Sequence, residues 1–121
     1  MRKTVMIVDA SGNFRTVFKL VLQNAGYAVV EAVDGKHAVS KLMGQKLDLI
    51  VCEANLPKMG GLRFLRPAKR TRASPSTPVI VLTTESQAEK KTGGRAARAC
   101  AWITKPVQPS ALIGAVNRPC L

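Results

Sequence analysis

The chain has 121 residues, enough for one domain with one hydrophobic core, and 46% of them are apolar, which excludes a disordered protein. No apolar run approaches the roughly 20 residues of a membrane span, and the N-terminal MRKTVMIV lacks the apolar region of a signal peptide. Three cysteines without metal-ligand spacing fit a reducing compartment, so we expect a cytoplasmic protein. A net charge of +12 favours acidic partners such as nucleic acid, although a solvated basic surface explains it more simply.

Strand and helix patterns alternate in the first part of the chain. Apolar runs over 4–9 and 27–32 predict two strands, and the first of them closes on the carboxylate of Asp9. A helix is predicted between them, capped near Ser11 and ended by Gly26. Helical spacing places on its inner face Phe14, Val17, Phe18, Val21 and Ala25. Asp34 begins a second helix that Gly44 ends, with inward-facing Ala38, Val39, Leu42 and Met43.

The stretch from 47 to 61, LDLIVCEANLPKMGG, contains the candidate site. Its apolar run over 47–52 is short, rich in β-branched residues and followed by turn residues, which predicts a strand buried on both faces. Glu53 comes directly after this run. A carboxylate at the end of a buried strand lies where open α/β sheets bind their ligands, so we expect the chemistry of the protein here.

The second half continues the alternation with less regular helices. A helix over 61–72 should end or kink near Arg66, because Pro67 removes a helical hydrogen bond. Strands follow over 79–83 and 100–104, with a soft helix over 86–98 between them that contains Gly93 and Gly94. Pro109 begins a last helix, whose inner face carries Leu112, Ile113 and Val116. Residues 118–121 are expected to form a tail or linker.

This alternation indicates βαβ units and a parallel sheet in a single domain over 1–121. Four segments in order, IVDAS, DLIVCEANLPKMGGL, PVIVLTTES and AWITKP, carry a resemblance to a known family. The chain resembles the receiver domain of two-component response regulators, of the chemotaxis-regulator type. The resemblance implies a five-stranded, doubly wound, flavodoxin-like sheet, a strand order that periodicity alone leaves open. It also implies a signalling module rather than an enzyme.

The resemblance assigns roles to residues at the strand ends. In the family, carboxylates at the ends of strands one and three hold Mg²⁺ and accept a phosphoryl group. Asp9 matches one metal carboxylate, Glu53 stands at the phospho-acceptor position, and Asn55 matches the position whose backbone carbonyl serves the metal. Ala10 replaces the second acidic residue of strand one, and Glu53 replaces an aspartate. We therefore expect Mg²⁺ binding to be weak or absent.

Further matches complete the expected site. Thr83 matches the hydroxyl that binds the phosphoryl group, and Lys105, before Pro106, matches the phosphate-binding lysine, whose Lys–Pro bond is usually cis in the family. Trp102 stands where members of the family often carry an aromatic switch residue coupled to the hydroxyl at Thr83, and ordinary strand packing explains it equally well. Because Ala10 removes a negative charge, we expect Lys105 to pair directly with Glu53.

The favoured function is a receiver module with impaired or absent phosphorylation that acts by binding a protein, such as a histidine kinase or an output domain. The family's partner face would comprise the helix over 86–98, the strand over 100–104 and the last helix. One alternative is weak, Mg²⁺-dependent phosphorylation of Glu53. Another is a basic module that binds nucleic acid weakly and non-specifically through the cluster Arg63, Arg66, Lys69, Arg70 and Arg72. We expect His37 to face solvent.

Overall fold

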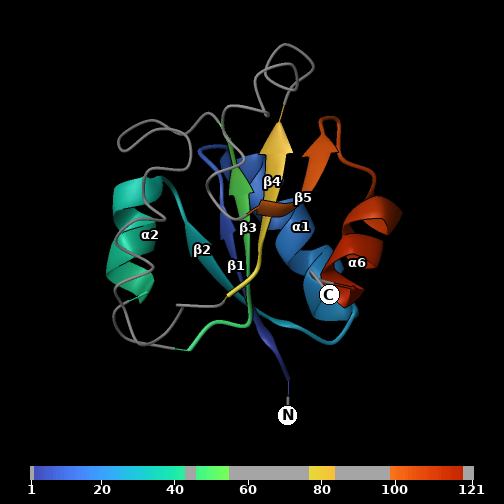
Figure 1. Ribbon diagram of the computed structural model, residues 1–121, viewed down its shortest axis with the longest axis horizontal. Helices are drawn as coiled ribbons and strands as arrows, with labels where there is room; N and C mark the ends of the chain where they lie inside the picture. Colours follow the sequence, from blue (N-terminus) through green and yellow to red (C-terminus); the bar gives the residue numbers. More distant parts are fainter. Residues whose placement is uncertain (1, 43–45, 55–76, 84–98, 119–121) are drawn as a thin grey trace.

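The computed structural model describes residues 2–42, 46–54, 77–83 and 99–118, and in these ranges one five-stranded parallel sheet forms the centre of the molecule (Figure 1). The strand order is β2-β1-β3-β4-β5, and every neighbouring pair is parallel. The strands are β1 (Thr4–Val8), β2 (Ala28–Ala32), β3 (Leu49–Glu53), β4 (Val79–Thr83) and β5 (Ala99–Thr104). This order confirms the flavodoxin-like sheet.

Helices cover both faces of the sheet in the described ranges. Helices α1 (Gly12–Asn24) and α6 (Pro109–Asn117) pack on one face, and α2 (Gly35–Leu42) packs on the other (Figure 1). None of these described helices is long and apolar enough to cross a membrane. The helices expected over 61–72 and 86–98 lie outside the described residues, as does the basic cluster between Arg63 and Arg72.

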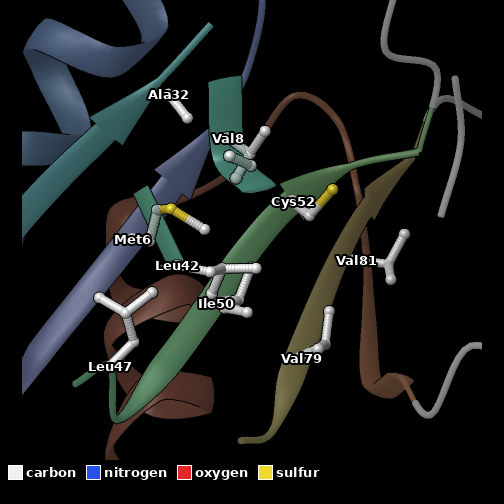
Figure 2. Packing of buried hydrophobic residues seen from close by; sticks show 10 residues of the cluster. Met6, Val8, Ala32, Leu42, Leu47, Ile50, Cys52, Val79 and Val81 are labelled. Carbon is white, nitrogen blue, oxygen red and sulfur yellow. The ribbon is translucent and has the colours of Figure 1, made fainter. Parts of the chain in front are cut away.

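The core consists of two apolar clusters, one on each side of the sheet. Alternate residues of the central strands belong to opposite clusters, so β3 and β4 are buried on both faces as expected. Figure 2 shows the cluster beneath α2, which contains Met6, Val8, Ala32, Ala38, Leu42, Leu47, Ile50, Cys52, Val79 and Val81. The cluster beneath α1 and α6 contains Val5, Ile7, Phe18, Leu22, Leu49, Val51, Ile80, Leu82, Leu112 and Val116.

Polar side chains and one glycine fix the ends of the first two helices. The Ser11 hydroxyl accepts a hydrogen bond from the Phe14 amide at 3.1 Å, and Gly26 adopts φ 97° just after α1, as its predicted C-cap role requires. Asp34 caps α2 by accepting from the His37 amide at 2.8 Å. His37 itself is half-buried, and its Nδ1 accepts from the Val33 amide at 3.1 Å. The expectation that His37 faces solvent was therefore wrong, because its ring closes the turn before α2.

The inner face of α1 agrees with the predicted one in part. Phe18 and Leu22 are its buried residues, whereas Val17 is 51% exposed and Ala25 is exposed. Residues four apart lie on the same side of a helix, so Phe18 and Leu22 both face the sheet. Val17 lies on the side that faces solvent. Ala25 lies beyond the last helical turn, at the C-cap. The periodicity correctly predicted the helix and the inward positions of Phe14, Phe18 and Val21, but it included Val17 and Ala25 and left out Leu22.

Two truncations on α1 test this assignment. Leu22 is fully buried, so Leu22→Ala should lower the free energy of unfolding by about 2–5 kcal/mol through lost burial and a cavity. Val17→Ala removes an exposed side chain of the same helix and should change it by less than about 0.5 kcal/mol. Urea unfolding of both variants gives the comparison. Equal losses of stability in the two variants would instead indicate that Val17 is buried, as the periodicity predicted.

Candidate functional site

Three charged side chains meet where three strands of the sheet end. Asp9 directly follows β1, Glu53 is the last residue of β3, and Lys105 directly follows β5. The ammonium Nζ of Lys105 lies 2.9 Å from Asp9 Oδ2 and 3.2 Å from Glu53 Oε1. The carboxyl ends of parallel strands form the crevice in which open α/β sheets bind ligands. These three residues are therefore the centre of the candidate site.

Asp9 is the most deeply buried member of the site, with 1% of its surface exposed. Its Oδ1 accepts from the Ser11 amide at 2.8 Å, while its Oδ2 accepts from Lys105. Its own amide donates to the Ala32 carbonyl of β2 at 3.1 Å. A buried carboxylate needs such donors because the loss of water is otherwise unfavourable. Both oxygens of Asp9 are thus engaged by the protein itself.

Glu53 is less buried, and its carboxylate is also engaged on both sides. Its Oε1 accepts from Lys105, and its Oε2 lies 3.4 Å from the amide of Ala10, a long hydrogen bond. The direct contact between Lys105 and Glu53 confirms the pairing expected from the sequence. The shorter contact of Lys105 is with Asp9, which that expectation did not include. The lysine therefore bridges two carboxylates rather than one.

The two carboxylates change the protonation of Lys105. Burial acts to lower the pKa of Lys105, but the hydrogen bond that Lys105 donates to Asp9, the charge of Asp9 and the charge of Glu53 together outweigh burial. The pKa of Lys105 is therefore raised above its usual 10.5, and the side chain stays a cation at neutral pH. Its backbone is held as well: the Lys105 amide donates to the Thr83 carbonyl at 2.6 Å, and the Lys105–Pro106 bond is cis, as in the family.

Two residues of α1, Phe14 and Arg15, contact the site, although the sequence analysis did not assign them to it. The Phe14 ring lies beneath the ammonium of Lys105, with 4.8 Å between Nζ and the ring centroid. Arg15 donates from Nη1 to the Asp9 carbonyl at 2.6 Å and from Nε to Glu31 at 3.1 Å. Both residues lie in the first turn after β1, directly beside the strand end. Phe14 and Arg15 follow Asp9 by only five and six residues, and this short separation in the sequence could have indicated that they lie beside the site.

The remaining predicted residues occupy different places. Thr83 is almost fully buried at the end of β4, next to Thr104 of β5 in the sheet register. Trp102 pairs in register with Val81 and packs against the apolar cluster beneath α2, which fits an ordinary packing role. The coupling of Trp102 to Thr83 stays a prediction. Asn55 lies outside the described residues.

The described residues do not fit a Mg²⁺ ion in this arrangement. Mg²⁺ requires oxygen ligands in near-octahedral geometry, whereas the two carboxylates are bonded to an ammonium group and Ala10 offers no side-chain ligand. In the described part of the chain no group of three His, Cys, Asp or Glu side chains could hold a metal. Neighbouring Cys52 adds no ligand: burial first, and then Glu53 and Asp9, raise the pKa of its thiol well above 9.0. It remains a protonated, buried thiol.

A doubly wound parallel sheet with two carboxylates and a lysine at its carboxyl edge is the architecture of a signalling receiver. The sequence pattern of the response regulator receiver domain matches residues 5–117, and the chain belongs to this family. It is a receiver domain of two-component signalling, a class of signalling modules.

Similar proteins support this assignment to the family. The chain is 31% identical to the chemotaxis protein CheY of Thermotoga maritima, over 98% of both chains. It is 32% identical to the phosphate regulon transcriptional regulatory protein PhoB of Pseudomonas aeruginosa, over 92% of this chain. It covers 48% of that regulator, so the chain spans about half the length of such relatives. The solved structure of chemotaxis protein CheY4 of Vibrio cholerae superposes with a TM-score of 0.90 at 34% identity, covering 98% of this chain and 99% of that one.

The raised pKa of Lys105 predicts a specific loss of stability in alkaline solution. Because folding raises this pKa above 10.5, the folded state holds the proton more tightly than the unfolded chain. The stabilisation is complete below pH 10.5 and is lost as the pH rises through the folded pKa. Lys105→Arg keeps its charge, since the guanidinium pKa exceeds about 12. Urea unfolding from about pH 8 to 11.5 should show a steeper fall for the wild type than for Lys105→Arg. Parallel curves would contradict the assignment.

Proposed function

We propose that this chain is a receiver module whose phosphoryl site is closed by its own lysine, and that it signals by binding a protein in one fixed conformation. The observation that carries the proposal is the position of Lys105, 2.9 Å from Asp9 and 3.2 Å from Glu53. The cation occupies the space between the two carboxylates that remain in the pocket. Phosphorylation is impaired or absent in consequence.

Charge and geometry both oppose phosphorylation of Glu53. To attack phosphorus, its carboxylate must separate from Lys105 and face an incoming anion without a metal ion held by a second carboxylate. Ala10 cannot supply that carboxylate. Glutamate also carries its oxygens about 1.5 Å further from the backbone than aspartate does. A misplacement of about 1 Å can cost on the order of 100-fold in an oriented reaction.

The same contacts limit any conformational switch. A ligand shifts an equilibrium only by the difference between its affinities for the two states. Lys105 already has anionic partners, so a phosphoryl analogue offers little that the two carboxylates do not provide. Mg²⁺ would have to displace the ammonium before it could bind. We therefore expect weak or absent Mg²⁺ binding, and a β5 end that keeps one arrangement.

The partner is proposed to be a protein of the same signalling system, either a histidine kinase or an output domain. The proposed surface comprises β5, α6 and the segment 86–98, of which the structure describes the first two. Support comes from the link between this surface and the site: Lys105 lies between β5 and α6 and pairs with Asp9 and Glu53. A closed site therefore holds one edge of the partner surface in place.

Amide NMR spectra recorded with and without beryllofluoride and Mg²⁺ test the closed site. The wild-type spectrum should stay unchanged, because Lys105 and the two carboxylates already satisfy one another. Ala10→Asp combined with Glu53→Asp should gain a response, since it restores the acidic pocket and shortens the acceptor. Mass spectrometry after incubation with a small phosphodonor should show addition to the double variant alone.

Ala10→Asn with Glu53→Asn is the matched control, because asparagine has nearly the volume of aspartate without its charge, and this variant should not respond. Large wild-type shifts at Thr83 and Trp102 would reveal a working switch and defeat the proposal. Addition of a phosphoryl group to wild-type Glu53 would favour the alternative of weak phosphorylation. A folded double variant that stays silent would mean that these two positions do not account for the loss.

The basic charge supports only a secondary function. With a net charge of +12, we expect weak, non-specific nucleic-acid binding at low salt. The logarithm of the binding constant should fall by roughly 0.9 for each phosphate contacted per tenfold rise in salt. Fluorescence anisotropy with unrelated duplexes should show binding disappear near physiological salt. Tight binding that depends on duplex sequence at that salt would instead identify nucleic acid as the main partner.

A further inference from the structure

Phe14 contacts the charged site from a helix that contributes none of the charged side chains that pair with Lys105. Its ring centroid lies 4.8 Å from the Lys105 ammonium, within the range of a cation–π interaction. We propose that Phe14 is a positioning residue that holds Lys105 between Asp9 and Glu53. This inference rests on the proposed function, because it explains what keeps the site closed. It also adds a residue outside the acidic pocket to the closure.

The position of the Phe14 ring is fixed by the core beneath it. Phe14 stacks on Phe18 with 4.4 Å between the ring centroids and 25° between the ring planes. Phe18 is buried in the cluster beneath α1 and α6, so the lower ring is immobilised by packing. Phe14 is half-buried and presents its other side to the ammonium. The lysine thus rests on a preformed aromatic surface, with no ordering of a flexible side chain required.

The first turn of α1 holds both the ring and the carboxylate that faces it. The Ser11 amide donates to Asp9, and the Ser11 hydroxyl accepts from the Phe14 amide. Arg15, the next residue, donates to the Asp9 carbonyl and pairs with Glu31 of β2. Any movement of this turn would therefore move the Asp9 carboxylate and the Phe14 ring together. Lys105 therefore meets one hydrogen-bonded turn that provides a negative charge and an aromatic face.

The ring also acts on the charges by excluding water. Lys105 is 24% exposed and Asp9 is 1% exposed, so the pair lies in a partly dry environment. An apolar ring beside an ion pair lowers the local dielectric constant and strengthens the attraction between the charges. The π face in addition attracts the ammonium directly. An aliphatic side chain of similar volume would supply only the first of these effects.

Competitive acetylation of the wild-type chain and its variants measures how firmly Lys105 is held. A limiting amount of acetic anhydride reacts with each lysine according to its freedom and protonation, and peptide mass spectrometry gives the ratio of Lys105 to Lys36. Lys36 is an exposed residue of α2 and serves as the internal reference. Phe14→Leu should raise the ratio by about 2- to 30-fold, the range that corresponds to the loss of a cation–π contact. Phe14→Tyr keeps the π face and should leave the ratio unchanged.

Val21→Ala is the matched control for packing. Val21 is half-buried on the same helix and packs against the same cluster, so its truncation loosens α1 while the Phe14 ring stays in place. The ratio in Val21→Ala should equal that of the wild type. An unchanged ratio in Phe14→Leu would overturn the proposal. An equal rise in Val21→Ala or in Phe14→Tyr would also overturn it, since the effect would then come from packing or from volume.

The two proposals fail separately. A wild-type response to beryllofluoride and Mg²⁺ contradicts the closed site, whatever acetylation shows for Phe14. A silent wild type with unchanged acetylation in Phe14→Leu contradicts only the role of the ring. Adding Phe14→Leu to the Ala10→Asp, Glu53→Asp variant gives a second readout: the beryllofluoride midpoint should fall by about 2- to 30-fold if the ring restrains Lys105. An unchanged beryllofluoride midpoint in a folded triple variant would contradict the proposed role of Phe14 in positioning Lys105.

Discussion

The ion pairs of Lys105 are the interaction on which the site depends. One ammonium group pairs with two carboxylates that approach each other at the ends of β1 and β3 and offsets one of their two negative charges. Without it, Asp9 would be a buried charge opposite a second negative charge, an arrangement that is strongly unfavourable. The lysine also connects three strand ends that are distant in the sequence. Removing it would therefore disturb electrostatics and the carboxyl edge of the sheet together.

The fold makes this contact almost unavoidable. Parallel strands place all their carboxyl ends on one edge, and the order β2-β1-β3-β4-β5 sets β1 beside β3 in the centre. Asp9 and Glu53 are thereby neighbours across one ladder. β5 lies two positions from β3, and the long side chain of Lys105 covers that distance. With Ala10 in place of a third acid, one lysine is sufficient to satisfy the carboxylates that remain.

The fold was predictable from the sequence because burial of the central strands leaves apolar runs that turn residues interrupt. The sequence resemblance supplied the strand order, which periodicity cannot give. Element ends were less predictable: β3 runs Leu49–Glu53 rather than over 47–52, since Asp48 turns to accept from the Thr4 amide at 2.7 Å. The prediction for the buried strip of α1 included Val17 and left out Leu22, because apolar residues occupy more than one face of this helix. Val17 and Leu22 are both apolar, and only the tertiary packing decides between them.

The charged residues of the site were predictable from the sequence, but the neighbouring residues that hold them in position were not. Asp9, Glu53 and Lys105 stand at the ends of apolar strands, so parallel topology places them at one edge, and the strand order brings them together. The simultaneous ion pairs of Lys105 with Asp9 and Glu53 depend on side-chain positions to within a few tenths of an ångström, and no sequence pattern encodes such positions. Phe14 was assigned to the core on its helical spacing, and it does pack there through Phe18. Its second contact, with Lys105, depends on which way a half-buried ring faces.

These supports explain why a receiver fold can persist without its full acidic pocket. A pocket with three carboxylates would hold more negative charge than one lysine can offset, so a bound cation would stabilise it. Here Lys105 pairs with both Asp9 and Glu53 and offsets one of their two charges, and Arg15 pairs with Glu31 nearby. Among the described residues no buried side-chain nitrogen or oxygen lacks a hydrogen-bond partner. In this arrangement the described polar groups of the site satisfy one another, which is the basis of the closed site proposed above.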